Sequence, residues 1–177
     1  MEKLLNVFDL TQNQTINIIL LLTVFLVVFC GSLIVLNSIS IHRKKKKNRE
    51  LIYSGNFLYY KEFEENWIIS RGSGLKYEDG PGCYVITIYN HPVTDGNFSN
   101  YDNIYIGQSV NVFKRVHDHI KGKGNGDVYA DIKYGKQVYI RFVRCKKESL
   151  NSVEKNLIAS FNSTASYNKT KGGAKKR

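Results

Sequence analysis

The feature that most constrains this chain is an uncharged apolar run near its N-terminus. From Ile16 to Leu36, 21 consecutive positions carry no charged side chain, and most of them are Leu, Ile, Val or Phe. A helix rises about 1.5 Å per residue, so this run is long enough to cross a hydrocarbon core of about 30 Å. Because it is apolar on every face, it does not fit an amphipathic helix lying on a membrane surface. The run predicts a transmembrane helix over residues 16–41, preceded by a short extracytoplasmic tail over residues 1–15.

A cleaved signal peptide is the alternative explanation of this run. The apolar core of a signal peptide is usually about 7 to 15 residues long, follows a basic segment and precedes a small-residue cleavage site. Here the run is longer, Lys3 is offset by Glu2, and no small-x-small site follows. Bulky Phe29 before Cys30 also disfavours lipoprotein processing. These features favour an anchor that is retained.

The net charge of +11 is concentrated in two clusters. Six Lys or Arg residues lie between His42 and Glu50, directly after the apolar run, and five more lie from Lys169 to the C-terminus. Only Lys3 precedes the run. Because segments rich in Lys and Arg stay in the cytoplasm, the N-terminus is predicted to be outside and the soluble part cytoplasmic. We expect the cluster after the run to touch anionic lipid headgroups, with DNA binding as a secondary role.

The three cysteines suggest neither a disulfide framework nor a zinc site. Cys30 lies in the apolar run, and Cys83 and Cys145 lie in strand-like segments. No CxxC pair or Cys/His pair has the spacing of zinc ligands. Reduced thiols fit a cytoplasmic domain.

Periodic apolar patterns predict the strands and helices of the soluble part. Runs of β-branched and aromatic residues at 83–89 and 103–106 predict an antiparallel hairpin, and 138–143 predicts a third strand. Apolar residues at a 3.6 period predict one helix between Ser109, its expected cap, and Gly122. A second helix is predicted at 148–161.

The order of these elements predicts the fold class and the domain bounds. The order β-β-α-β-α is typical of a small α+β domain, here a three-stranded antiparallel sheet flanked by helices over residues 80–173. Residues 42–79 are assigned to a basic linker and extension, and residues 174–177 to a basic tail. A polyanion would prefer the second half of the domain, because residues 101–168 carry eleven basic and six acidic side chains.

Glu154 interrupts the apolar stripe of the second predicted helix. The residues at i−4, i+3 and i+4 from it are Leu150, Leu157 and Ile158. A carboxylate among such neighbours is expected to be partly buried and to need a cation or a proton, and a metal ion is one candidate cation. Alternatively, Glu154 lies at the edge of the stripe and pairs with Lys or Arg in solvent.

Arg115 and His119 lie four residues apart on the first predicted helix. This spacing places a fixed positive charge beside a group that exchanges protons near neutral pH. Such a pair suits a phosphate group. The alternative is a solvated helix face with no ligand.

Two tripeptides, Gly-Cys-Tyr at 82–84 and Tyr-Ile-Gly at 105–107, resemble the short strand motifs that name the GIY-YIG nuclease superfamily. The passage from Tyr105 through Arg115 to His119 is similar to the family's strand-to-helix passage, which carries its active Arg and His. Glu154 stands where the family's metal-binding Glu stands, and residues 167–173 resemble its terminal Asn motif. The resemblance covers about residues 80–173. The chain departs from the family pattern at Cys83 and in the longer stretch between the two motifs.

The resemblance implies a phosphodiesterase that uses a single Mg²⁺ or Mn²⁺ ion. In this interpretation Glu154 holds the metal on the scissile phosphate, and Arg115 neutralises developing charge. A tyrosine, Tyr84 by preference, activates water, while Tyr105 and His119 assist proton transfer. The implied catalytic residues are Tyr84, Tyr105, Arg115, His119 and Glu154, with Gly107 and Asn168 in supporting positions.

The sequence therefore predicts a membrane-anchored, metal-dependent endonuclease that hydrolyses DNA on the cytoplasmic side. Its expected partners are DNA and membrane lipid, and incoming foreign DNA is the hypothesised target. The alternative is a non-catalytic, membrane-tethered module that binds nucleic acid or a protein partner.

Overall fold

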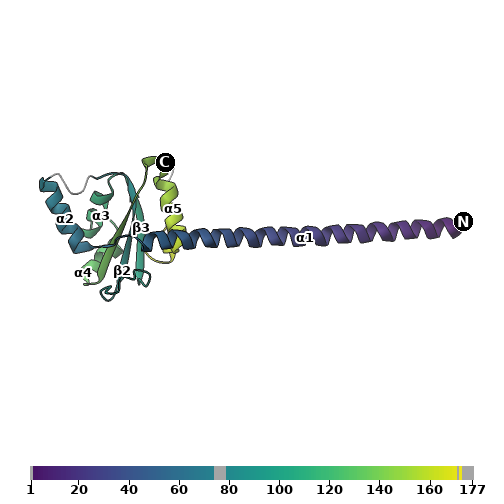
Figure 1. The fold of residues 1–177 in the computed structure, drawn as a ribbon, viewed down its shortest axis with the longest axis horizontal. Helices are drawn as coiled ribbons and strands as arrows, with labels where there is room; N and C mark the ends of the chain where they lie inside the picture. The colour runs from purple at the N-terminus through teal and green to yellow at the C-terminus, as the bar shows by residue number, and fades with distance from the viewer. Residues whose placement is uncertain (1, 74–78, 171, 173–177) are drawn as a thin grey trace. The chain divides into compact units, whose positions relative to one another are not determined.

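The computed structural model describes residues 2–73, 79–170 and 172. The chain divides into two units, residues 1–43 and residues 44–177. Helix α1 (Glu2–Tyr53) runs through the first unit, and its last turns belong to the second (Figure 1). The predicted basic tail, residues 174–177, lies outside the described residues.

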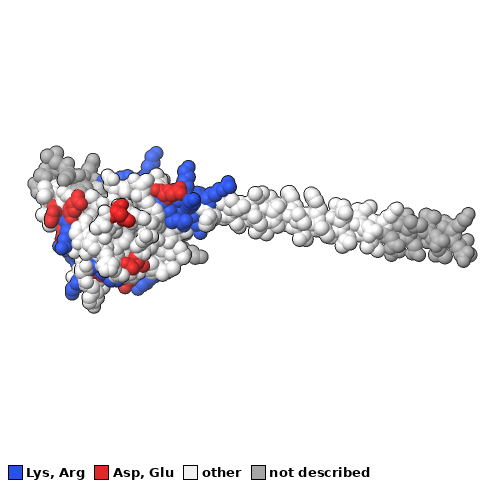
Figure 2. Space-filling view, turned by 60° about the horizontal axis from the view of Figure 1, so that its bottom comes forward, with Lys and Arg blue, Asp and Glu red and all other residues white. Residues whose placement is uncertain are grey.

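In the first unit, α1 carries the apolar run. Its apolar stretch is white in Figure 2 because it bears no Lys, Arg, Asp or Glu. The most apolar window of this helix is not buried within the protein, unlike a core helix of a soluble domain. The prediction of a helix long and apolar enough to cross a membrane is confirmed.

The second unit is an α+β domain built on an antiparallel sheet of four strands in the order β1-β4-β2-β3 (Figure 1). The strands are β1 (Leu58–Tyr59), β2 (Gly82–Tyr89), β3 (Asn103–Ser109) and β4 (Gln137–Arg144). The α+β class, the β2–β3 hairpin and the third predicted strand are confirmed. The sheet nevertheless has four strands where the sequence predicted three. The sequence analysis missed β1 because this strand is only two residues long and shows no alternating pattern.

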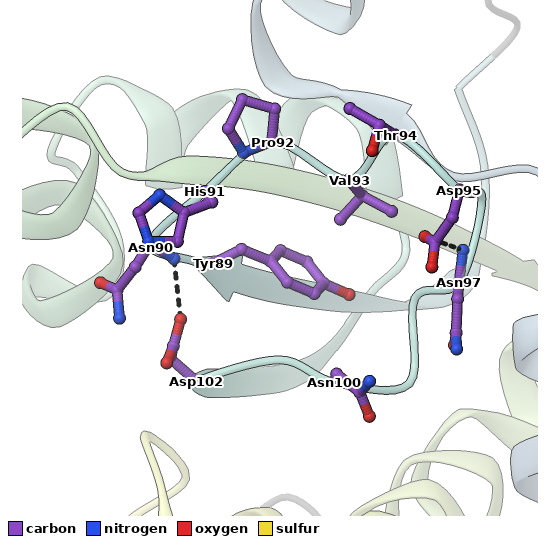
Figure 3. Close-up of a pocket in the computed structure, with 10 residues that line it drawn as sticks. All are labelled: Tyr89, Asn90, His91, Pro92, Val93, Thr94, Asp95, Asn97, Asn100 and Asp102. Carbon is purple, nitrogen blue, oxygen red and sulfur yellow. Dashed lines mark hydrogen bonds between the residues drawn. The ribbon is translucent and has the colours of Figure 1, made fainter.

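The long connection between β2 and β3 is folded against the sheet (Figure 3). The Asp102 carboxylate accepts a hydrogen bond of 2.7 Å from Asn90 N, and Asp95 accepts one of 2.9 Å from Asn97 N. Phe98 stacks on Phe57 with ring centroids 4.3 Å apart. These contacts hold the loop without disturbing the pairing of β2 with β3, which runs without interruption from Gly82 to Ile88.

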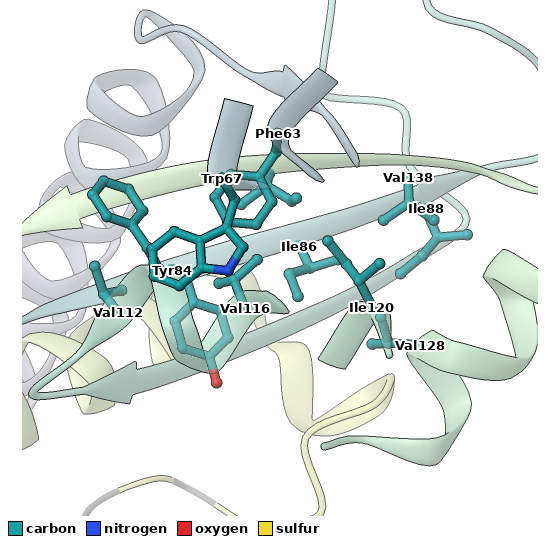
Figure 4. Close-up of a cluster of buried hydrophobic side chains, with 12 residues drawn as sticks. Phe63, Trp67, Tyr84, Ile86, Ile88, Val112, Val116, Ile120, Val128 and Val138 are labelled. Atoms are coloured by element: carbon teal, nitrogen blue, oxygen red, sulfur yellow. The ribbon is translucent and has the colours of Figure 1, made fainter. Parts of the chain in front are cut away.

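Two apolar clusters cover the two faces of the sheet. One face packs against α2 (Tyr60–Ser73), α3 (Val112–Ile120) and α4 (Gly126–Lys133), as Figure 4 shows. The other packs against α5 (Leu150–Phe161) and the end of α1. The central strand β2 is buried along its whole length. Its side chains are therefore held rigidly between the two layers.

Residues 44–73, from the stretch that the sequence analysis assigned to a linker and extension (42–79), belong to the second unit together with the sheet. Ile52 at the end of α1 is 3% exposed, and Arg49 Nη1 donates a 2.8 Å hydrogen bond to the carbonyl of Ser160. Phe63 and Trp67 of α2 enter the core one helical turn apart. Their i, i+4 spacing lies in a segment rich in acids and other aromatics, so the stripe is weak in the sequence.

Two further local features of the structure differ from what the sequence predicted. Ser109 does not cap α3; instead the Asp79 carboxylate accepts hydrogen bonds from Phe113 N at 2.9 Å and Lys114 N at 3.0 Å. Because the capping carboxylate lies more than thirty residues away in the sequence, it leaves no local sequence signal. Helix α4 was not predicted, although its Asn125 cap accepts from two backbone N–H groups at its N-terminus.

Candidate active site

His119 is buried in the last turn of α3, with 0% of its surface exposed. Its Nδ1 accepts a 2.7 Å hydrogen bond from the backbone N–H of Asn125. A neutral imidazole whose Nδ1 accepts must carry its proton on Nε2. Nε2 lies 2.8 Å from Tyr84 Oη, so His119 donates this bond to the tyrosine oxygen.

The environment keeps His119 neutral. Burial, assisted by the positive charge of Arg115, lowers its pKa to about 4. The alternative of a solvated helix face is therefore wrong for His119, whereas Arg115 on the same helix is half-buried. His119 acts as a fixed hydrogen-bond donor near neutral pH and does not carry a charge.

Tyr84 comes from the central strand β2 and is 1% exposed. Its ring joins the apolar cluster, and its hydroxyl points away from the cluster's aliphatic side chains (Figure 4). Gly107 lies opposite it in the register of β2 and β3. Burial, with a smaller contribution from Tyr105, raises the pKa of Tyr84 above its usual range, while the charge and hydrogen bond of Arg115 oppose the shift.

Tyr105 lies on β3 between the histidine and the pocket that contains Glu154. Its ring centroid is 5.0 Å from that of His119 and 6.2 Å from that of Tyr84. Burial raises the pKa of Tyr105, and the negative charge of Glu154 adds to this shift. The charge of Arg115 and a hydrogen bond with Tyr84 act in the opposite direction and lower this pKa. Tyr105 is half-buried and lines the pocket, whereas Tyr84 does not.

Glu154 of α5 is 9% exposed, so the predicted burial of this carboxylate is confirmed. Its Oε2 accepts a 3.0 Å hydrogen bond from Gln108 Nε2. It lines a pocket of about 250 Å³ together with Tyr105, Tyr167 and Lys169. The backbone of Gly172 also lies beside it, where a side chain would press on the carboxylate. The carboxylate is thus largely shielded from solvent but borders a cavity.

The donor atoms of this pocket fit a hard divalent cation. Within the described part of the chain, no group of three or more His, Cys, Asp or Glu side chains could enclose a metal. Mg²⁺ does not need such a group, because it keeps several waters and is often held by one or two carboxylates together with substrate phosphate. Glu154 therefore fits the role of single protein carboxylate, and Tyr105 lines the same pocket.

Asn168 connects the C-terminal segment to β3. Its Oδ1 accepts from Ile106 N at 2.9 Å, and its Nδ2 donates to Ile106 O at 2.7 Å. Because β3 is an edge strand, these two bonds satisfy a backbone amide and carbonyl that the sheet leaves free. Asn168 thus fixes the strand that carries Tyr105 and Gly107. Residues 171 and 173 of the predicted Asn motif lie outside the described residues.

Three residues near the site were not predicted from the sequence. Asn125 fixes the tautomer of His119, and Gln108 donates to Glu154. Gly124 lies against the His119 ring, where a Cβ atom would overlap Nδ1. The only available signal was the glycine-rich segment 122–126, which indicated a turn and not a close approach to a histidine.

No family model matches this chain, and neither does any curated protein or solved structure.

Proposed function

We propose that this chain is a membrane-anchored endonuclease of the GIY-YIG type that hydrolyses DNA phosphodiester bonds with Mg²⁺ or Mn²⁺ at Glu154. The observation that supports this most is the position of Tyr105. Its phenol packs against His119 and feels the charges of both Arg115 and Glu154. Tyr105 thus joins the pocket of Glu154 to the neighbouring Arg115 and His119, which is the combination of carboxylate, cation and hydrogen-bonding groups that suits phosphoryl chemistry.

The charged groups have complementary roles in this proposal. A divalent ion bound at Glu154 would polarise the phosphate and lower the pKa of a water molecule. Arg115 would neutralise the negative charge that develops on the phosphate oxygens. Asn168 would hold β3 in place and take no part in the chemistry.

The direction of the hydrogen bonds favours Tyr105, and not Tyr84, as the water-facing tyrosine. The Asn125 amide donates to His119, and His119 donates to Tyr84 Oη. Because Tyr84 Oη already accepts from His119, its own proton is free to bond Tyr105. The phenolate form of Tyr105, stabilised by the hydrogen bond from Tyr84 and by the charge of Arg115, would then take a proton from water at the pocket and become a neutral phenol. The sequence alone had favoured Tyr84 for this role.

A cleavage assay on the purified full chain tests the proposal. Plasmid DNA should be cut in the presence of Mg²⁺ or Mn²⁺, and Glu154→Gln should slow cutting by about 100-fold or more. Glu148→Gln is the matched control, since it makes the same charge change at an exposed position just before α5. Cutting by Glu154→Gln at the rate of the unaltered chain would refute the proposed site.

A second candidate function is a non-catalytic module that binds nucleic acid or a protein partner at the membrane. It is favoured by the lack of a preformed three-ligand metal cluster among the described residues. Such a module would retain DNA at low salt without cutting it, and Glu154→Gln would leave retention unchanged.

The membrane and orientation part of the proposal rests on α1 and on the cationic residues after it. Positive charges that follow the apolar run favour a cytoplasmic domain. An anchored nuclease would act on DNA that passes close to the membrane, and incoming foreign DNA is our hypothesis for its target. Equal entry of plasmid or phage DNA into cells with and without the intact chain would contradict that hypothesis.

A further inference from the structure

We infer that a pocket between the end of α1 and the C-terminal half of α5 binds the phosphate headgroup of an anionic membrane lipid. This inference rests on the membrane-anchor part of the proposed function and does not depend on nuclease activity. It assigns lipid binding to a built site on the folded domain, beyond diffuse attraction by a basic segment.

The pocket has a volume of about 290 Å³ and is lined by two aliphatic and four polar or charged residues. Its lining residues are Lys45, Lys155, Ile158, Ala159, Asn162 and Thr164. The two lysines come from helices that are far apart in sequence. This composition suits a phosphate with an attached organic group, because ammonium, amide and hydroxyl groups bind the phosphate oxygens while aliphatic side chains contact the remainder.

The position of Lys45 is fixed by contacts three and four residues further along α1. Asn48 Nδ2 donates to Ser160 Oγ at 3.1 Å, and Arg49 donates to the Ser160 carbonyl at 2.8 Å. Residues at i, i+3 and i+4 share one helix face, so Lys45 lies on the face that packs against α5. Lys45 is accordingly half-buried, whereas Lys44, Lys46 and Lys47 are exposed.

Neither lysine of the pocket has a carboxylate partner among the described residues. The ion pairs found there use Lys46, Lys114, Lys121 and Lys136. Half-buried Lys45 and exposed Lys155 line the same small pocket, and an anion bound there would be attracted by both charges. Lys and Arg side chains also gather at the end of the domain where the chain enters from residue 44 (Figure 2). The pocket therefore selects an anion.

A lipid is the favoured source of that anion because of the position of Lys45 in the sequence. Lys45 follows Ile41, the last residue of the predicted span, by four residues. Four residues reach at most about 14 Å even when fully extended. If the apolar run crosses a bilayer, Lys45 stays close to the headgroup layer, where anionic phosphates are concentrated. Nucleic acid and soluble phosphate have no comparable reason to be held there.

The test uses the full chain in lipid nanodiscs and measures how fast individual lysines are acetylated by an amine-reactive reagent. Discs contain either phosphatidylcholine alone or phosphatidylcholine mixed with phosphatidylglycerol. We expect Lys45 and Lys155 to react several-fold more slowly in the phosphatidylglycerol discs. Lys61, which is exposed on α2, serves as the internal control and should react equally in both.

Charge-matched variants separate the pocket from diffuse attraction. Lys45→Gln should abolish the protection of Lys155, whereas Lys47→Gln, which removes the same charge from an exposed position, should preserve it. Equal loss of protection in both variants would overturn the pocket in favour of diffuse electrostatics. Unprotected Lys155 in phosphatidylglycerol discs would overturn it as well.

Further arms in phosphatidylcholine discs identify the source of the anion. Protection by added inorganic phosphate, or by a DNA oligonucleotide, would overturn the assignment to a lipid. A chain that fails to enter discs contradicts the anchor and this inference together, whereas a chain that enters without protection contradicts only this inference. In Glu154→Gln, Lys45 and Lys155 should be acetylated at the same rates as in the unaltered chain. Failure of the nuclease proposal can therefore be distinguished from failure of the lipid-binding inference.

Discussion

Gly107 lies directly against the hydroxyl group of Tyr84. The two residues face each other across β2 and β3, and a methyl group at position 107 would overlap Tyr84 Oη. The missing side chain therefore provides the space in which Tyr84 Oη reaches His119. This explains in physical terms why a glycine follows Tyr-Ile in the second motif.

We expect Gly107→Ala to displace Tyr84 and to break its hydrogen bond with His119. Overpacking of this kind costs about 1 to 3 kcal/mol of unfolding free energy, and DNA cleavage should be lost with it. Gly126→Ala is the control, since no atom lies within 4 Å of its added Cβ and alanine favours the helix that begins there. Chemical denaturation of both variants, read alongside cleavage, makes the comparison. A fully stable and active Gly107→Ala would show that Tyr84 is not held in this way.

Substitution of the two tyrosines should separate catalysis from stability. Tyr105→Phe is expected to reduce the single-turnover cleavage rate by about 100-fold or more, as loss of a general base does, with little effect on unfolding. Tyr84→Phe should instead destabilise the fold by about 1 to 3 kcal/mol, because the buried Nε2–H of His119 loses its acceptor. The opposite result, with Tyr105→Phe as active as the unaltered chain, would return the role of base to Tyr84.

The stability of the domain should depend on pH through His119. Its folded pKa of about 4 lies below the unfolded value of about 6.5, so the unfolded chain binds the proton first. The contribution of His119 to the unfolding free energy is thus fully present above pH 6.5 and is lost as the pH falls toward 4. The loss amounts to at most about 3 kcal/mol. His119→Gln should show a smaller fall in unfolding free energy over this range. His91→Gln changes an exposed histidine, and its unfolding free energy should fall as much over this pH range as that of the unaltered chain. Parallel slopes for His119→Gln and the unaltered chain would contradict the assignment.

Periodic burial explains which parts of the fold were predictable from the sequence. Strands β2, β3 and β4 and helices α3 and α5 have regular apolar patterns, and their predicted bounds lie within a few residues of those observed. The stripe of α5 also predicted the burial of Glu154. These features depend on residues close in sequence, which pattern analysis reads directly.

The missing parts depend on short segments or on long-range contacts. Strand β1 has two residues and α4 has eight, which is too few for a clear period. The Asp79 cap of α3 joins segments more than thirty residues apart. The neutral tautomer of His119 depends on a backbone amide beyond the helix end, so no side-chain pattern encodes it.

The end of α1 gives the last prediction, because two adjacent residues there have opposite environments. Ile52 is 3% exposed and packs with α5 and β3, whereas Leu51 is 68% exposed. Ile52→Ala should lower the unfolding free energy of the domain by about 2 to 5 kcal/mol, as removal of a buried aliphatic side chain does. Leu51→Ala removes a side chain of the same size from solvent and should change it by less than about 0.5 kcal/mol. Denaturation of the detergent-solubilised chain measures both. Equal effects would mean that residues 44–53 act as a linker, and a fragment that begins at residue 54 would then fold as well as one that begins at residue 44.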